Sequence, residues 1–217
     1  MLRKLERIFA LLKEPRVIKK LMAMYSNGYL HDIGWFNSFK ENRPIDRYGK
    51  ALPWVTYSFI DFISDRLNKN MSVFEYGLGN STLWYASKVN NVTSVEHDLD
   101  WFNEIKNQMP DNVSLFFEKL EYGKNYSKKS KTLNKKFDVI IVDGRDRVNC
   151  MMQAIEAIKD NGVIILDDSE RETYEKGIEF LLNEGFKKID FWGISPGLFY
   201  RKCTTIFYKN NNNVLDI

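Results

Sequence analysis

The chain has 217 residues, 44% hydrophobic and 28% charged, which is the size and composition of a globular protein with one main domain and a short addition. Its formal net charge is only +3, from 32 basic and 29 acidic residues, so the overall charge gives no argument for a nucleic-acid partner. Two cysteines, Cys150 and Cys203, are too few for a disulfide framework or a zinc cluster and favour a reducing cytoplasm. The longest apolar run near the N-terminus, Ile8 to Leu12, is too short for a secretory signal or a transmembrane helix.

The N-terminal segment has the pattern of two amphipathic helices. Apolar residues recur at intervals of three and four from Leu2 to Leu12, and after Pro15 a second helix is expected from about Arg16 to Tyr25. Through Lys20 this segment has seven basic residues against two acidic ones. A basic amphipathic helix can lie on an anionic membrane surface, and it can also be the solvated face of a packed helix. We take the packed helix as the simpler interpretation and keep peripheral membrane contact as the alternative.

Residues 29–54 are rich in aromatic side chains, which need something to pack against. We therefore expect a loop-rich lid that folds over the core and forms a wall of an acceptor pocket. Residues 1–53 are assigned to this N-terminal lid segment and residues 54–217 to the main domain. The polar groups of the lid that are candidates for acceptor contacts are His31, Asp32, Asp46, Arg47 and Lys50.

The stretch from Ser72 to Asp98 predicts a strand, a tight turn, a helix and a second strand. Gly77 and Gly79 allow the backbone to turn sharply and a ligand to approach closely, because glycine has no Cβ atom. The hydroxyls of Ser81 and Thr82 can cap the helix that follows. Glu96 ends the second strand, about twenty residues after the glycine turn, where a carboxylate binds ribose hydroxyls in nucleotide-binding folds.

The remaining chain alternates between predicted strands and helices. A helix from Val55 to about Leu67 precedes the central unit, and a lysine-rich excursion with a short helix fills residues 118–136. Strands are expected at 113–117, 137–143, 162–168, 187–192 and 204–208, and helices at 100–108, from 150 to a stop at Asn161-Gly162, and at 174–183. The polar tail at 210–213 is expected to be frayed.

Three predicted parallel strands end in acidic residues: Glu96, Asp143 and the pair Asp167 and Asp168. The carboxyl ends of parallel strands form the ligand crevice of an open α/β sheet, so these carboxylates should converge on one site. Two arginines, Arg145 and Arg147, directly follow Asp143. They can bind a carboxylate or phosphate of a substrate, or they can pair with neighbouring acids.

The motifs EYGLGNST, VEHD, VDGRDR and LDDSER, spread over Trp54 to Lys209, together resemble the class I S-adenosylmethionine-dependent methyltransferases, and PIDRYGKALPW resembles a lid of uncharacterised bacterial members. The resemblance implies a Rossmann-like three-layer α/β/α sandwich with a mainly parallel seven-stranded sheet and an antiparallel last strand. It also implies S-adenosylmethionine as the cofactor, with the glycine loop against its methionine part and Glu96 on its ribose. The implied cofactor-binding residues are Glu75, Tyr76, Gly77, Gly79, Asn80, Ser81, Thr82, Glu96, His97 and Asp143.

Methyl transfer to a hydroxyl requires that a proton be removed, by a general base or with the help of a metal ion. Asp143 is a candidate catalytic residue, and His31 is a candidate base if the lid closes. A partial resemblance to catechol-type O-methyltransferases implies instead that Asp143, Asp167 and Asp168 hold Mg²⁺. The candidate substrate contacts are Arg145, Arg147, Asp168 and Tyr174.

These observations predict a cytoplasmic methyltransferase that acts on an oxygen of a small molecule or sugar, with the oligomeric state left open. An aminopropyl transferase on the same fold is an alternative, although it would need an acidic polyamine pocket. A non-catalytic cofactor-binding module is a second alternative. A nucleic-acid methyltransferase is disfavoured, because VDGR stands where an N-P-P-Y motif is expected after the fourth strand.

Overall fold

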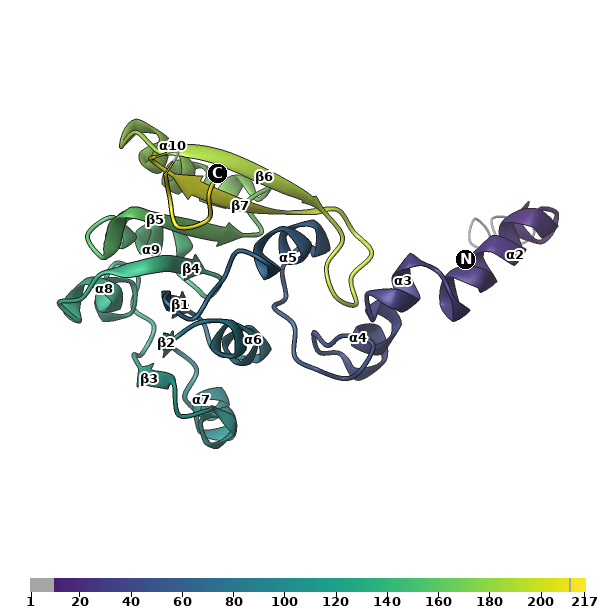
Figure 1. Ribbon diagram of the computed structural model, residues 1–217, viewed down its shortest axis with the longest axis horizontal. Coiled ribbons are helices and arrows are strands. Elements are labelled where there is room, and N and C mark those ends of the chain that lie inside the picture. The colour runs from purple at the N-terminus through teal and green to yellow at the C-terminus, as the bar shows by residue number, and fades with distance from the viewer. Residues whose placement is uncertain (1–9, 211) are drawn as a thin grey trace.

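The centre of the molecule is a seven-stranded sheet with the order β3-β2-β1-β4-β5-β7-β6 (Figure 1). The structure is a computed structural model that describes residues 10–210 and 212–217. Neighbouring strands are parallel except where β7 pairs with β5 and with β6, so the predicted mainly parallel sheet with an antiparallel last strand is confirmed. The strands are β1 (Ser72–Tyr76), β2 (Asn91–Glu96), β3 (Val113–Phe117), β4 (Phe137–Val142), β5 (Ile158–Asp167), β6 (Lys187–Gly193) and β7 (Lys202–Tyr208).

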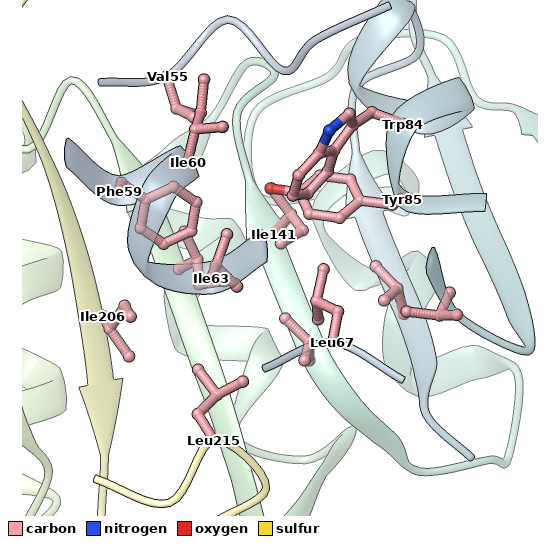
Figure 2. Packing of buried hydrophobic residues seen from close by; sticks show 14 of the residues in the cluster. Val55, Phe59, Ile60, Ile63, Leu67, Trp84, Tyr85, Ile141, Ile206 and Leu215 are labelled. Carbon is pink, nitrogen blue, oxygen red and sulfur yellow. The ribbon is translucent and has the colours of Figure 1, made fainter. Parts of the chain in front are cut away.

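Helices cover both faces of the sheet, because the side chains of the central strands are apolar on both sides. In β4, Val139 and Ile141 join the hydrophobic cluster of α5 and α6, whereas Ile140 and Val142 join the cluster of α8, α9 and α10. Figure 2 shows the first cluster, in which Phe59 and Ile63 of α5 and Tyr85 of α6 lie near Ile141. The helices are α2 (Pro15–Ser26), α3 (Tyr29–Asp32), α4 (Trp35–Glu41), α5 (Tyr57–Ser64), α6 (Asn80–Lys88), α7 (Leu99–Ile105), α8 (Asn125–Thr132), α9 (Arg147–Ala154) and α10 (Glu175–Asn183), with single 3₁₀ turns at Lys106–Gln108 and Glu172–Tyr174.

Strand β5 begins earlier than the sequence pattern predicted. Helix α9 ends at Ala154, and Ile158, expected in the helix, already pairs with Phe137 of β4. The chain turns at Ala157, whose carbonyl accepts a hydrogen bond from the N–H of Phe137. A shift of register between Phe137 and Val139 accommodates Asn161 and Gly162 inside the strand. The predicted helix stop at Asn161-Gly162 is therefore wrong.

The N-terminal segment is more helical than expected. Pro15 begins α2 rather than only interrupting a helix, and the predicted helix before it falls largely outside the described residues. Residues 29–54, expected to be loop-rich, contain α3 and α4. Trp35 of α4 is buried, and its indole N–H donates to the carbonyl of Leu198 at 3.1 Å, so this part is fastened to the loop between β6 and β7.

The C-terminal tail packs against the body instead of fraying. Asn213 and Leu215 are buried, and the N–H of Val214 donates to the carbonyl of Asn161. The early start of β5 presents this carbonyl to the tail, so the two differences from the sequence-based expectation have one origin. Within the described residues, no helix combines the length and the apolar character that crossing a membrane requires.

Candidate functional site

A cavity of about 560 Å³ lies at the carboxyl ends of β1, β2, β4 and β5. These strand ends provide its floor, and residues from the segment between α4 and α5 form one wall. The carboxylates of Glu96, Asp143 and Asp168 all line it, so the expected convergence of strand-end acids is seen for these three. The lining residues are Asn42, Arg43, Pro44, Trp54, Glu75, Gly77, Leu78, Gly79, Asn80, Ser81, Glu96, His97, Trp101, Asp143, Gly144, Arg145, Arg147, Asp168 and Arg171.

The glycine loop after β1 is held close to the loop after β4. Gly77 has a φ of +121°, a conformation that side chains other than glycine rarely adopt. At Gly144 a Cβ atom would lie 2.1 Å from the Tyr126 hydroxyl and 3.0 Å from the Tyr76 carbonyl, so only glycine fits there. The indole N–H of Trp101 donates to the carbonyl of Leu78 at 2.6 Å. The loop is thereby fixed before any ligand binds.

Glu75 is fully buried at the end of β1, with one carboxylate oxygen engaged and one free. The Thr82 hydroxyl donates to Oε2 at 2.5 Å and accepts from the N–H of Gly79 at 3.0 Å, which connects the acid to the start of α6. Oε1 is buried and makes no hydrogen bond with any residue that the structure describes. Burial raises the pKa of Glu75 to about 7, against opposing effects of the nearby Ser81 and Thr82 hydroxyls. A buried polar atom without a partner indicates a place where a ligand supplies the partner.

Glu96 at the end of β2 is held in one orientation by the backbone that follows it. Its Oε1 accepts from the N–H groups of His97 and Asp98 at 2.7 and 2.8 Å, and Nδ1 of His97 lies 2.6 Å from the same oxygen. Oε2 makes no hydrogen bond within the described part of the chain. The side chain is only 6% exposed, so this oxygen is a pre-oriented acceptor in the cavity wall.

The three aspartates at the ends of β4 and β5 are paired with two buried cations. Nζ of Lys202 lies 3.0 Å from Oδ2 of Asp167 and 2.7 Å from Oδ1 of Asp168. Arg147 pairs with Oδ1 of Asp143 at 3.0 Å and lies 3.5 Å from Oδ2 of Asp168. Burial raises the pKa of Asp143 and of Asp167 above their usual values. For Asp168 burial acts in the same direction, but Lys202, Arg147 and Arg171 together lower its pKa.

This arrangement does not fit the predicted magnesium site. Among the described residues no group of three carboxylate, histidine or cysteine side chains is placed to hold a metal ion. Asp167 does not line the cavity, and the ammonium of Lys202 contacts both Asp167 and Asp168, where the ion was expected. The prediction that Asp143, Asp167 and Asp168 form a metal centre is therefore wrong, because Lys202 and Arg147 already supply the positive charge.

Arg147 fastens the ends of β4 and β5 to each other. Its Nε donates to the carbonyl of Gly144 at 3.0 Å, its Nη2 to the carbonyl of Asp143 at 2.8 Å, and its Nη1 to the carbonyl of Asp167. Most hydrogen-bond donors of the guanidinium are thus engaged within the protein. This agrees with the alternative interpretation, in which the arginine pairs with neighbouring acids instead of binding a substrate. Arg145 is exposed and makes no ion pair within the part of the chain that the structure describes.

Eleven of the sequence-predicted site residues line the cavity. Five others do not, and neither do the remaining lid candidates Asp32, Asp46, Arg47 and Lys50. Tyr76 points away from the cavity, to the face of the sheet that α8 covers, where its hydroxyl contacts Ser127 and Ser130. His31 lies on α3 beside Asp32 with 44% of its side chain exposed, so it does not reach the cavity as a base. Thr82 and Asp167 do not line the cavity but contact residues of the site: Thr82 donates to Glu75, and Asp167 pairs with Lys202. Tyr174 lies against the Arg147 guanidinium, with 5.3 Å between Cζ and the ring centre.

Sequence reasoning missed Asn42, Arg43, Pro44 and Trp101. Trp101 is three residues beyond the helix-capping Asp98, and a tryptophan so near the acid-ending strand was a usable signal. Nothing in the local pattern distinguishes Arg43 from Arg47, which was proposed and does not line the cavity. The difference arises from Pro44, whose carbonyl accepts a 2.7 Å hydrogen bond from the Asn80 amide and so brings Arg43 to the glycine loop.

No family model matches the chain. A curated protein that does match, nuclear hormone receptor family member nhr-103 of Caenorhabditis elegans, is 29% identical over 124 residues. The match covers 52% of this chain and 30% of that protein, so the chain spans less than a third of this relative, and the match assigns no family.

Several solved structures are similar over about 70% of the chain. Precorrin-6y C5,15-methyltransferase from Geobacter metallireducens has a TM-score of 0.54 at 14% identity, covering 70% of this chain and 87% of that one. An rRNA methylase from Streptococcus thermophilus has a TM-score of 0.51 at 10% identity, covering 69% and 93%. The glycopeptide N-methyltransferase MtfA, solved with S-adenosyl-L-homocysteine, has a TM-score of 0.51 at 13% identity, covering 69% and 87%. Such identities establish a fold and leave the acceptor open. The chain has the fold of the class I S-adenosylmethionine-dependent methyltransferases, as the resemblance in its motifs predicted.

Proposed function

We propose that the protein is an S-adenosylmethionine-dependent methyltransferase that binds its cofactor in the cavity over β1, β2 and β4. The observation that carries this proposal is the pair of oriented carboxylates on either side of the glycine loop: buried Glu75 with its free Oε1, and Glu96 with its free Oε2. S-adenosylmethionine carries an ammonium, a sulfonium and two ribose hydroxyls, so it offers donors and positive charge to both acids. Gly77, Gly79, Asn80, Ser81 and His97 complete this part of the wall.

The reaction we propose is transfer of the methyl group to an oxygen of a small molecule or sugar. The cofactor supplies an activated methyl group and its own leaving group, so the protein must mainly position the acceptor and remove its proton. We assign the second task to Asp143; two observations support this, since the residue lines the cavity and burial raises its pKa well above the usual value. Arg147 holds Asp143 in place through its carboxylate and its carbonyl.

The cavity favours a small acceptor over nucleic acid. It is concave and closed on one side by Pro44 and Trp54, whereas the lysine-rich segment around α8 contributes no residue to it. An aminopropyl transferase is less favoured, because arginines rather than further acids stand at the cavity mouth. Cys150 and Cys203 are free thiols, which supports the cytoplasm as the proposed location.

Calorimetric titration with S-adenosylhomocysteine tests the cofactor assignment. We expect wild type to bind, and Glu96→Ala to bind at least about tenfold more weakly, because hydrogen bonds to a charged group contribute roughly 1.5–3 kcal/mol. Glu118→Ala is the matched control, since Glu118 pairs with Lys129 and does not line the cavity. Absence of binding to wild type, or equal weakening in both variants, contradicts the assignment. A non-catalytic module would bind the cofactor and transfer no methyl group to any acceptor.

A further inference from the structure

Three arginines from separate parts of the chain line the cavity. Arg43 follows α4, Arg145 follows β4 and Arg171 follows β5, and all three are exposed lining residues. The sheet order places β2, with Glu96, on one side of β1, and β4 and β5 on the other. Arg145 and Arg171 therefore lie at the end opposite the proposed ribose site, and Arg43 lines the same cavity from the segment after α4.

The positive charge at this end exceeds the negative charge beside it. Arg171 pairs with Oδ2 of Asp168 at 2.5 Å, but that carboxylate already contacts Lys202 and Arg147. Arg43 and Arg145 make no ion pair with any described residue. Two guanidinium groups on a cavity wall without a carboxylate partner form a site for an anion, because their planar N–H groups match a carboxylate or phosphate.

Arg43 is held near the cofactor loop by the backbone around it. The N–H of Arg43 donates to the carbonyl of Ser38, and the next carbonyl, that of Pro44, accepts the 2.7 Å hydrogen bond from Asn80 at the start of α6. Trp54 stands in the same wall, with its indole N–H donating to the carbonyl of Pro196 at 2.8 Å. The segment between α4 and α5 thus contributes a cation and an aromatic side chain to the wall of the cavity that would hold the methyl donor.

We propose that the methyl acceptor is a small anionic molecule whose phosphate or carboxylate group is bound jointly by Arg43 and Arg145. The assignment of this molecule as the methyl acceptor rests on the proposed methyltransferase function, whereas the anion-binding site itself does not. A small anion fits better than a polymer, since the two arginines line one concave cavity from different segments and do not form a stripe across the surface.

Calorimetry with two probes, inorganic pyrophosphate and malonate, tests this site at 150 mM salt, with and without saturating S-adenosylhomocysteine. We expect wild type to bind at least one probe, and Arg43→Gln/Arg145→Gln to bind it at least about tenfold more weakly, since each lost charge-assisted pair contributes on the order of a tenfold change. The matched control is Arg47→Gln/Arg66→Gln, which removes the same charge from residues outside the cavity and should bind as wild type does. The probe that binds identifies phosphate or carboxylate as the group.

The proposal is overturned if neither probe binds wild type, or if both double variants bind equally well. Tighter binding of a 12-residue oligouridylate than of pyrophosphate, lost with Arg43 and Arg145, would overturn the small acceptor in favour of RNA. Pyrophosphate or malonate binding without S-adenosylhomocysteine binding would keep the anion site and remove the proposed function.

Discussion

Glu75 is a buried carboxyl group that lines the cavity and has no charged partner among the described residues, so its ionisation should be visible in the stability of the protein. Burial raises the pKa of Glu75 from 4.5 to about 7. An acid whose pKa is raised by folding stabilises the folded state by binding a proton, fully below the unfolded value of 4.5. This contribution is lost as the pH rises through about 7, and the rise in pKa corresponds to roughly 3 kcal/mol.

Glu75→Gln should therefore become more stable than wild type as the pH increases. Between pH 5 and pH 8 the difference in free energy of unfolding should shift by roughly 2.5 kcal/mol in favour of the glutamine variant, which carries no ionisable group there. Urea unfolding at four pH values in this range measures the shift, and the difference between the proteins removes the contribution of other titrating groups. A difference independent of pH would mean that Glu75 is already ionised at pH 5.

The sequence predicted the strand-end acids of the site and the nearby Arg145 and Arg147, but not its other cations Lys202 and Arg43. Glu96, Asp143 and Asp168 each end a strand, and strand ends can be read from an apolar run. Lys202 begins β7, which is antiparallel and comes last in the chain, and reaches Asp167 only because Thr204 pairs with that residue. The position of Arg43 in the cavity wall depends on the hydrogen bond from the Asn80 side chain to the carbonyl of Pro44. Residues so far apart in the sequence leave no periodic pattern that would predict their contact. This is why a metal site was predicted where Lys202 and Arg147 contact the aspartates.

At the scale of elements, the local sequence pattern predicted the strands that are buried along their whole length. It failed for residues 155–161, whose secondary structure depends on pairing with a distant strand. All strands of the sheet were expected, including β4, whose apolar run FDVIIV has no competing interpretation. For residues 155–161 the apolar spacing of Ile155 and Ile158 is equally compatible with a helix. The hydrogen bond from Phe137 to Ala157 determines the strand instead, and it cannot be deduced from either segment alone.

Helix α2 is amphipathic, with an apolar face and a basic face. It has no buried residue and projects away from the sheet (Figure 1). Val17, Leu21 and Met24 lie on one face and are all exposed, while Arg16, Lys19 and Lys20 lie on the other. A second copy of the chain would bring lysines together without acids from α2 to pair them. An anionic membrane surface complements both faces, so we now favour peripheral membrane contact, which was the alternative interpretation of the sequence, for this element.

Val17→Gln/Leu21→Gln should weaken binding to vesicles several-fold, because it removes apolar area that would enter the interface without changing charge. Co-sedimentation with vesicles containing 30% phosphatidylglycerol measures this, and neutral phosphatidylcholine vesicles should bind much less. Ala23→Gln, on the polar face of the same helix, is the control and should bind as wild type does. Equal binding by all three proteins, or a dimer that depends on Leu21 in sedimentation, would contradict the membrane assignment.

At the scale of the whole molecule, the hydrophobic core crosses the predicted boundary between residues 53 and 54. Leu30 and Trp35 belong to the same cluster as Val55 and Phe59, and the ring centres of Trp35 and Phe199 are 3.9 Å apart. By contrast, α2 contacts the body mainly through Tyr25, which packs against Phe36 and accepts a hydrogen bond from Lys40. These contacts favour a structural boundary near residue 28.

A chain that starts at residue 28 should fold like the full protein, and one that starts at residue 54 should not. The shorter deletion removes an exposed helix, so its melting temperature should lie within a few degrees of the full chain. The longer deletion removes Leu30, Trp35 and Ile45 from the core, and losing one large buried side chain alone costs roughly 3–5 kcal/mol. Since a domain of this size has only about 5–15 kcal/mol in total, we expect loss of a cooperative transition in circular dichroism. A sharp melt of the chain from residue 54, at the temperature of the full protein, would instead establish residues 1–53 as a separate lid.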